Sequence, residues 1–316
     1  MPVASAKGGR PFQDHRRVVE AIVWRFRTGV PWRDLPVDFG PWQTAWKRRH
    51  RCCLDGTWDR IHAELLRQAD AGEYIDWALS VDSTVNRAHQ HATTLARHTG
   101  GLSNYTNLRV EPADHGIGRS RGGLSTKIHP LVDGAGLPLV VLVGPGQAGD
   151  APMLPVLMTH LRVARSGRGR PRTRPERLGG DKAYSSRAIR GHLRSRGIAA
   201  VIPEPADQIV HRQRRGPHGG RPPAFDAADY KGRNVIERGI NTIKQWRGLA
   251  TRYDCDDEQV PPRGRGLTRV TTGLRCLVFD LSTARSGRCL LPSGRPGVSP
   301  NRLSQSVMAR RTAPPR

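Results

Sequence analysis

The sequence of 316 residues has no long apolar segment. Its longest run of apolar side chains, residues 137–143, has the length of a β-strand, whereas a helix that crosses a membrane needs about 18 such residues. The N-terminus also lacks the apolar stretch of a secretory signal peptide. We therefore expect a cytoplasmic protein without a membrane-spanning segment.

Cysteines are few, and they are not spaced for binding zinc. The five cysteines include no C-x-x-C pair, which is the spacing that zinc sites and many redox sites use. We expect all five thiols to be reduced and structural, as is usual for proteins of the cytoplasm. A disulfide-stabilised secreted domain is thereby excluded.

Acidic residues are scarce relative to basic ones. The chain has 27 Asp and Glu residues against 52 Lys and Arg residues, which gives a formal net charge of +25. A surface this basic binds polyanions by releasing the counterions that surround them. The composition favours a nucleic-acid-binding protein; the alternative is a ribosomal-type surface or one that only keeps the chain soluble.

The first part of the sequence is predicted to be helical. Val18, Ile22 and Phe26 recur at helical spacing after a capping residue, Asp14. Further helices are predicted at 42–54 and 58–68, and the first of these contains four basic residues: Lys47, Arg48, Arg49 and Arg51. Two interpretations stay open: a helix-turn-helix-like unit whose basic residues bind DNA, or a solvated basic helix that packs on the next domain.

From about residue 74 the hydrophobic period changes to that of an α/β domain. Strands are predicted at 75–81, 124–132, 137–143, 178–181 and 199–202, and helices at 150–164, 185–196 and 234–246. The polar segments 86–122 and 203–229 are predicted as loops. This order of elements is that of a ribonuclease-H-like fold, so we expect a catalytic domain over 74–254 after a helical region at 10–72.

Three acidic residues stand where this fold can bring them together. Asp82 ends the first predicted strand, Asp181 ends the fourth, and Glu237 lies in the closing helix. Mg²⁺ prefers hard oxygen ligands, and two such ions about 4 Å apart can activate a nucleophile and stabilise a leaving oxygen at a phosphodiester. The three residues are therefore candidate metal ligands and catalytic residues of an enzyme that cuts and joins DNA.

The residues around Glu237 allow two explanations. Arg233, Glu237, Ile240 and Lys244 would share one face of a helix. A carboxylate between two cations could seat a metal ion and hold adjacent phosphates. The same spacing is equally typical of an exposed helix with i,i+4 salt bridges.

The same segment resembles the signature of a known family. Tyr230, Arg233, Glu237 and Lys244 follow the pattern Tyr-x2-Arg-x3-Glu-x6-Lys, which is similar to that of DDE-type bacterial insertion-sequence transposases of the IS-five-like group. Further blocks resemble the family too: GVPWRDLP at 29–36, VDST at 81–84 with AHQHA at 88–92, GDKAY at 180–184 and QWRGLATRY at 245–253. The resemblance extends over roughly 10–254.

This resemblance implies a transposase that cleaves DNA at the ends of a mobile element. A metal-activated water would cut the strand, and the freed 3′-hydroxyl would then attack target DNA without a covalent protein–DNA intermediate. The implied catalytic and metal-binding residues are Asp82, Asp181 and Glu237. The implied cofactor is a pair of Mg²⁺ ions, with Mn²⁺ as an alternative.

The resemblance also implies what the protein binds. Tyr230, Arg233 and Lys244 would contact the element's end. The implied partners are double-stranded DNA, both the terminal inverted repeats and the target, and a second copy of the chain in a homodimer. The expected location is the cytoplasm, on the nucleoid.

Other candidate residues have simpler explanations. His89 and His91 could bind metal, but polar loop residues or DNA contacts are favoured. Asp133 and Asp150 are assigned to turn and helix-cap roles. The tryptophans of the helical region could stack on bases, but their setting favours a small core: Trp32, Trp42, Trp46 and Trp58.

Both ends of the chain depart from the family pattern. Residues 261–316 contain 11 arginines and one acidic residue, where relatives have an apolar helix. Our hypothesis for this tail is translation from a shifted reading frame; the alternative is a disordered basic DNA-binding tail. The start of the chain also looks short beside the family pattern. A second functional hypothesis is therefore an inactive remnant that occupies element ends as a repressor. A third is an RNA-binding protein.

Overall fold

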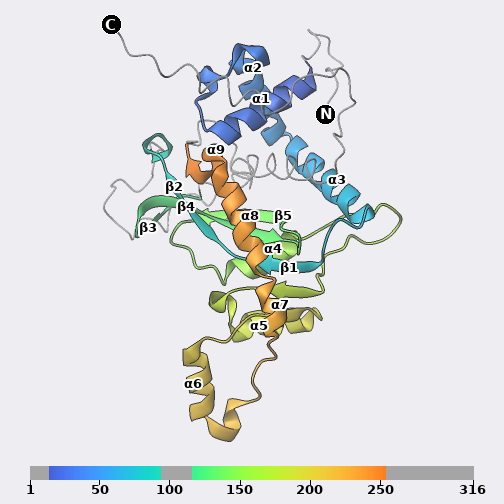
Figure 1. The fold of residues 1–316 in the computed structure, drawn as a ribbon, viewed down its shortest axis with the longest axis vertical. Coiled ribbons are helices and arrows are strands. Elements are labelled where there is room, and N and C mark those ends of the chain that lie inside the picture. The colour runs from blue at the N-terminus through green and yellow to red at the C-terminus, as the bar shows by residue number, and fades with distance from the viewer. Residues whose placement is uncertain (1–13, 94–115, 254–316) are drawn as a thin grey trace. The chain divides into compact units, whose positions relative to one another are not determined.

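The computed structural model of this chain describes residues 14–93 and 116–253 (Figure 1). The predictions for the tail at 255–316 and for the start of the chain fall outside the described residues. No helix within the two described ranges has the length and hydrophobicity needed to cross a membrane.

The N-terminal part is helical, as predicted. It contains α1 (His15–Thr28), α2 (Trp42–Leu54) and α3 (Thr57–Ala71), with short 3-10 turns at Trp32–Asp34 and Val37–Phe39. The side chain of Asp14 accepts a hydrogen bond of 3.0 Å from the Arg16 backbone N–H and so caps α1. Gly29, with φ of 72°, ends the helix in the left-handed conformation that glycine adopts most easily.

The following part is a mixed α/β structure built on one sheet. Its strands are β1 (Ala78–Val81), β2 (Thr84–Ala88), β3 (Gly118–Ser120), β4 (Gly123–Val132), β5 (Pro138–Pro145), β6 (Arg177–Gly179), β7 (Ala199–Val201) and β8 (Thr251–Arg252). Its helices are α4 (Met153–His160), α5 (Arg187–Ser195), α6 (Ala206–Arg214), α7 (Ala227–Lys231), α8 (Asn234–Gln245) and α9 (Arg247–Ala250).

The strand order confirms the predicted ribonuclease-H-like arrangement. β4 pairs antiparallel with β1 and with β5, while β6 pairs parallel with β1 and β7 pairs parallel with β6. The order across the sheet is therefore β5-β4-β1-β6-β7. β2 also pairs antiparallel with β4, so β1 and β2 act as one long strand interrupted after β1.

Two segments predicted as loops contain regular structure. β2 lies partly in the first of them, and it was missed because its inward-facing residues Thr84 and Asn86 are polar and buried. α6 lies in the second and α7 begins in it, and neither helix has a buried residue. A hydrophobic period can reveal only elements that bury apolar side chains on one face, so these elements gave no such signal.

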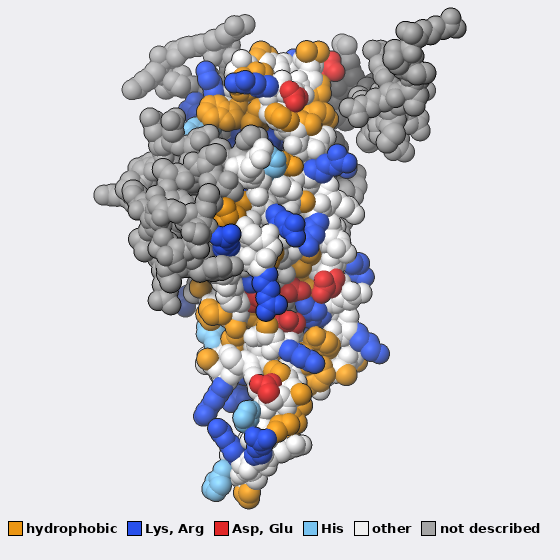
Figure 2. Space-filling model, turned by 90° about the vertical axis from the view of Figure 1, so that its left-hand side faces the viewer, with side chains coloured by type: hydrophobic (Ala, Val, Ile, Leu, Met, Phe, Trp, Pro, Cys, Tyr) orange, Lys and Arg blue, Asp and Glu red, His pale blue; other side chains and the backbone are white. Residues whose placement is uncertain are grey.

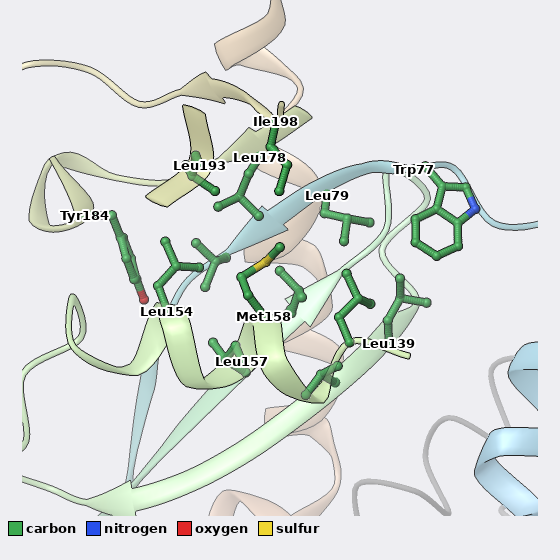
Figure 3. Close-up of a cluster of buried hydrophobic side chains, with 14 of the residues drawn as sticks. Trp77, Leu79, Leu139, Leu154, Leu157, Met158, Leu178, Tyr184, Leu193 and Ile198 are labelled. Carbon is green, nitrogen blue, oxygen red and sulfur yellow. The ribbon is translucent and has the colours of Figure 1, made fainter. Parts of the chain in front are cut away.

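The two faces of the sheet are covered by different helices. On one face, α4 and α5 enclose the main core, in which Leu79, Leu154 and Leu178 are essentially inaccessible to solvent (Figure 3). On the other face, α8 lies across the sheet and packs Ile236 and Ile240 against Val132 of β4 (Figure 1). α8 is thereby held over the ends of the central strands.

The N-terminal helices share a core with α8 and α9. Phe26 of α1 and Trp58 of α3 are buried in the same cluster as Ile243 and Trp246. The contact between α1 and α9 is so close that a Cβ atom on Gly248 would lie 2.8 Å from the Phe26 carbonyl oxygen. This supports the interpretation in which the basic helix region packs on the next domain; the helix-turn-helix interpretation stays a prediction.

This close approach leads to a stability prediction. Replacing Gly248 with Ala should lower the free energy of unfolding by about 1–3 kcal/mol, because the added methyl group meets backbone atoms of α1 that cannot rotate away. Gly191→Ala is the matched control: it lies inside α5 with nothing within 4 Å of the added Cβ. It should be stabilising by about 0.5–1 kcal/mol, since alanine favours helix.

Urea unfolding followed by circular dichroism measures both changes. Equal stability of Gly248→Ala and the unsubstituted protein would mean that α1 and α9 are not in backbone contact.

Candidate active site

The first two acidic candidates follow neighbouring parallel strands. Asp82 comes directly after β1, and Asp181 comes two residues after β6. In the parallel ladder Ser80 lies beside Gly179, so the same register extended by two residues sets Asp82 opposite Asp181. Adjacent strands are about 4.8 Å apart, so we infer from this register that the two residues lie side by side at one edge of the sheet.

Strand pairing also fixes the face on which Asp82 lies. Ser80 pairs with Val132, and Val132 contacts α8. Because side chains alternate along a strand, Asp82 lies on the same face as Ser80, toward α8. Its carboxylate accepts a hydrogen bond of 2.7 Å from the Ser83 backbone N–H, which restricts its orientation.

Asp181 is oriented by a short turn. Its side chain accepts a hydrogen bond of 3.0 Å from the Ala183 backbone N–H and caps the 3-10 turn Lys182–Tyr184. The ring of Tyr184, which is fully buried, anchors this turn in the main core. Both aspartates are thus held by backbone elements that have little freedom to move.

The third acidic candidate reaches the site from α8. Glu237 lies in the first turn of α8, and its side chain is half exposed. Arg233, the residue before α8, connects it to the strands: one guanidinium nitrogen lies 2.5 Å from Asp82 Oδ2 and the other lies 3.4 Å from Glu237 Oε1. A surface helix with an i,i+4 salt bridge would explain only the second contact.

The electrostatics of Asp82 depend on the other two acidic candidates. Burial raises the pKa of Asp82, and the charges of Glu237 and Asp181 act in the same direction. The Ser83 backbone N–H and the Arg233 guanidinium lower it. Glu237 and Asp181 are therefore near enough to act on the charge of Asp82.

The donor set suits a divalent cation of the Mg²⁺ type, because all three groups offer hard carboxylate oxygens. Within the described residues, however, no three His, Cys, Asp or Glu side chains form a ready-made group around an ion. Arg233 supplies the positive charge at the carboxylates of Asp82 and Glu237. The three residues therefore fit a metal site by the chemistry of their side chains, and the guanidinium of Arg233 lies between Asp82 and Glu237.

The predicted DNA-binding residues near the site differ in orientation. Lys244 is exposed in the last turn of α8. Tyr230 belongs to α7 and its ring lies 5.4 Å from that of Phe225. Arg233 faces the carboxylates rather than solvent, since its side chain is 15% exposed. On the face shown in Figure 2, a small group of acidic side chains is surrounded by Lys and Arg side chains.

The four basic residues predicted to bind DNA from α2 fall into two pairs. Lys47 and Arg51 are exposed. Arg48 and Arg49 are buried: Arg48 lies 2.9 Å from the Nδ1 atom of His15, and the Arg49 guanidinium lies 5.4 Å from the centre of the Phe26 ring. Helical periodicity could have separated the pairs, because residues 47 and 51 are one turn apart.

The tryptophans of the helical region differ in how deeply they are buried. Trp58 is buried in the shared core, as favoured by its helical setting. Trp32 and Trp42 are half-buried against the same core. Trp46 is 38% exposed and its ring is stacked on that of His50, with the two centres 5.3 Å apart.

Of the weaker candidates, Asp133 is explained by its turn. Its carboxylate accepts hydrogen bonds from the backbone N–H groups of Ala135 and Leu137 between β4 and β5. The ring of His89 lies 4.9 Å from that of Tyr253, and the side chain of His91 is outside the described residues.

Asp150 has a role that the sequence did not suggest. Its carboxylate lies 3.0 Å from Lys127 Nζ and 3.9 Å from Nδ1 of the fully buried His129. His129 lies on β4, and burial lowers its pKa to about 4. The ring nitrogens of His129 and the hydroxyl of Tyr184 have no hydrogen-bond partner among the described residues.

This buried polar group lies beneath the candidate site. Cross-strand pairing of β1 and β2 with β4 sets His129 opposite the bend that follows Asp82. The alternation of Lys127, His129 and Leu131 could have indicated that these side chains share a face, but nothing in the sequence indicated that the face is buried.

Comparison with known proteins identifies the class. Residues 73–260 match the family described as "Transposase DDE domain", and residues 1–62 match the family described as "Putative transposase of IS4/5 family". The first match covers more than half of the chain, so this chain belongs to the DDE transposases. The resemblance inferred from the sequence is thereby confirmed.

The chain is also similar to proteins of two bacteria. The chain is 40% identical over 96 residues to the uncharacterized protein y4sN of Sinorhizobium fredii, an alignment that covers 30% of this chain and 73% of that protein. It is 29% identical over 133 residues to the "Putative transposase for insertion sequence element IS6501" of Brucella ovis, with 42% and 85% covered.

Among solved structures, the Mos1 transposase paired-end complex with left transposon end has 13% identity and a TM-score of 0.22, with 79% of this chain and 83% of that chain covered. A TM-score this low does not by itself establish a common fold.

Proposed function

We propose that this transposase cleaves DNA at the ends of an insertion sequence and transfers the cut strand into target DNA, with divalent metal ions as cofactors. The observation that supports this most directly is the meeting of Asp82, Asp181 and Glu237 at one edge of the sheet. These residues are distant in the sequence and belong to the part that matches the DDE domain.

Asp82, Asp181 and Glu237 would hold two Mg²⁺ ions, for which Mn²⁺ is an alternative. When bound, such a pair supplies an activated oxygen nucleophile and stabilises the leaving oxygen. The protein contributes two rigid carboxylates at strand ends, fixed by the backbone N–H groups of Ser83 and Ala183. Glu237, half exposed on a helix, can adjust to complete the ligand set.

The DNA would follow the exposed side of α8. We assign Tyr230, Arg233 and Lys244 to contacts with the element's end, and the phosphate backbone is the natural partner of the two cations. Lys47 and Arg51 of α2 would add phosphate contacts. We assign Arg48 and Arg49 to packing instead, because burial keeps them from solvent. A homodimer on paired element ends is part of the same proposal.

The test is cleavage of a duplex oligonucleotide that carries the element's terminal inverted repeat. We expect a nick at the repeat's end with Mg²⁺ or Mn²⁺ and none with EDTA. A binding assay on the same duplex measures how DNA affinity depends on salt concentration. Replacing Lys47 or Arg51 with Gln should in each case lower the number of counterions released on binding by about one. Tight binding without cleavage at any metal concentration would instead identify a DNA-binding repressor, and stronger binding of RNA than of the repeat would contradict both.

A further inference from the structure

Arg233 is positioned where a metal ion would have to bind. Its guanidinium contacts Asp82 Oδ2 and Glu237 Oε1, which are oxygens of two of the three candidate ligands. We propose that Arg233 is a resident counter-ion that keeps metal ions out of the site, and that DNA admits the metal by drawing Arg233 to a phosphate. This inference depends on the proposed function of the three carboxylates.

The contacts are those of a shielded ion pair. The side chains of Arg233 and Asp82 are 15% and 18% exposed, so water screens their attraction only partly. The cluster without Arg233 would have three like charges at one edge of the sheet, a costly arrangement when a carboxylate is as buried as Asp82. Arg233 therefore stabilises the carboxylates in the absence of metal.

The backbone holds Arg233 at this point. It directly precedes α8 and makes no side-chain capping bond there. A Cβ atom on Gly179 would lie 3.9 Å from the Cβ of Arg233, so the start of α8 lies close to the end of β6. From this base the long side chain needs only a change of rotamer to leave Asp82 and Glu237.

Metal and guanidinium compete for the same oxygens. Three carboxylates carry a charge of −3, which Arg233 reduces to −2, and two Mg²⁺ ions would add +4 (formal charges at neutral pH). A metal ion near Asp82 or Glu237 must also take the lone pairs that Arg233 now uses. Binding of metal with Arg233 in place is therefore opposed both by repulsion and by the loss of its hydrogen bonds.

DNA offers Arg233 an equivalent partner. A phosphate accepts the guanidinium fork as a carboxylate does, and the exposed Lys244 on the same helix would bring the phosphate backbone toward it. DNA and metal should then assist each other's binding, since coupling between two ligands is reciprocal. Metal would be loaded mainly after the correct DNA has bound.

The experiment measures Mn²⁺ binding by isothermal titration calorimetry, with no reaction taking place. It compares the unsubstituted protein with Arg233→Gln, Arg233→Lys and Arg238→Gln, each alone and with a duplex that ends at the already cut position. Arg238 is the matched control because it is an exposed arginine on α8 whose loss changes the net charge equally. A titration of the duplex alone corrects for Mn²⁺ bound by DNA.

Without DNA, Arg233→Gln should bind Mn²⁺ about tenfold more tightly than the unsubstituted protein, since one nearby positive charge is removed. Arg238→Gln should stay within about twofold of the unsubstituted protein, because its more exposed charge is screened. The cut duplex should tighten Mn²⁺ binding by the unsubstituted protein and have little further effect on Arg233→Gln.

Unchanged or weaker Mn²⁺ binding by Arg233→Gln would overturn the inference, because Arg233 would then support the ligands rather than compete. If circular dichroism indicates that Arg233→Gln is unfolded, Arg233→Lys provides the test. The single-point charge of lysine should bind the carboxylates less well, so this variant should bind Mn²⁺ more tightly than the unsubstituted protein. Weaker Mn²⁺ binding by Arg233→Lys would overturn the proposal. Absence of Mn²⁺ binding in every protein, with and without duplex, would instead contradict the proposed metal-dependent function.

Discussion

Replacing Glu237 with Gln is expected to lower the rate of DNA cleavage about a thousandfold or more, while DNA binding is kept. Gln has the same shape but no charge, so it cannot complete a ligand set that depends on three carboxylates. Loss of one catalytic group typically has an effect of this size. The measurement is the single-turnover rate on the terminal-repeat duplex, with affinity determined separately in EDTA.

The matched control is Glu20→Gln. Glu20 is also half exposed and is also paired with an arginine one helical turn away, Arg16 at 2.9 Å. Its loss should leave the cleavage rate within about twofold of the unsubstituted protein, because an exposed pair of this kind contributes little. A cleavage rate for Glu237→Gln similar to that of Glu20→Gln would remove Glu237 from the active site.

The second large effect concerns acid stability. Burial keeps His129 neutral, with its pKa lowered from 6.5 to about 4. The folded state then binds fewer protons than the unfolded chain between these values. Neutral His129 therefore contributes to the free energy of unfolding above pH 6.5. This contribution, about 3 kcal/mol, is lost as the pH falls from 6.5 to about 4. Two charged groups face the ring: Asp150 favours its protonation and Lys127 opposes it.

His129→Gln, which cannot be protonated, should flatten the pH dependence of the free energy of unfolding over that window. His160→Gln is the control, because that histidine is at the surface at the end of α4. Asp82, whose raised pKa acts in the opposite sense, is present in all three proteins and cancels in the comparison. The free energy of unfolding is measured by urea titration at pH 7, 5.5 and 4.5. If it changes with pH equally in His129→Gln and in the unsubstituted protein, His129 is not the group responsible.

The sequence predicted the elements that bury apolar side chains. α1 and α2 were predicted nearly to the residue: Asp14 caps the first, and its apolar residues recur at helical spacing. β4 and β5 correspond to the strands predicted at 124–132 and 137–143. Elements whose inner face is polar, such as β2, or that bury nothing, such as α6, gave no such signal.

The three acidic residues of the candidate site were named from the sequence, and their roles stay a prediction. The positions of Asp82, Asp181 and Glu237 follow from strand order and family resemblance together. The orientation of a long flexible side chain does not: nothing in the sequence indicated that, without DNA, Arg233 contacts carboxylates or that Arg49 packs on an aromatic ring. Such contacts depend on tertiary packing, which periodicity does not specify.

The close backbone contact of Gly29 and Gly248 also bears on how such proteins diverge. A Cβ atom on Gly29 would lie 2.8 Å from the Cβ of Arg247, and one on Gly248 would meet α1. The two glycines belong to regions that match different families. Recombination that exchanged only one region for that of a distant relative would join surfaces that had not diverged together, so the two halves of this gene should be inherited as a pair.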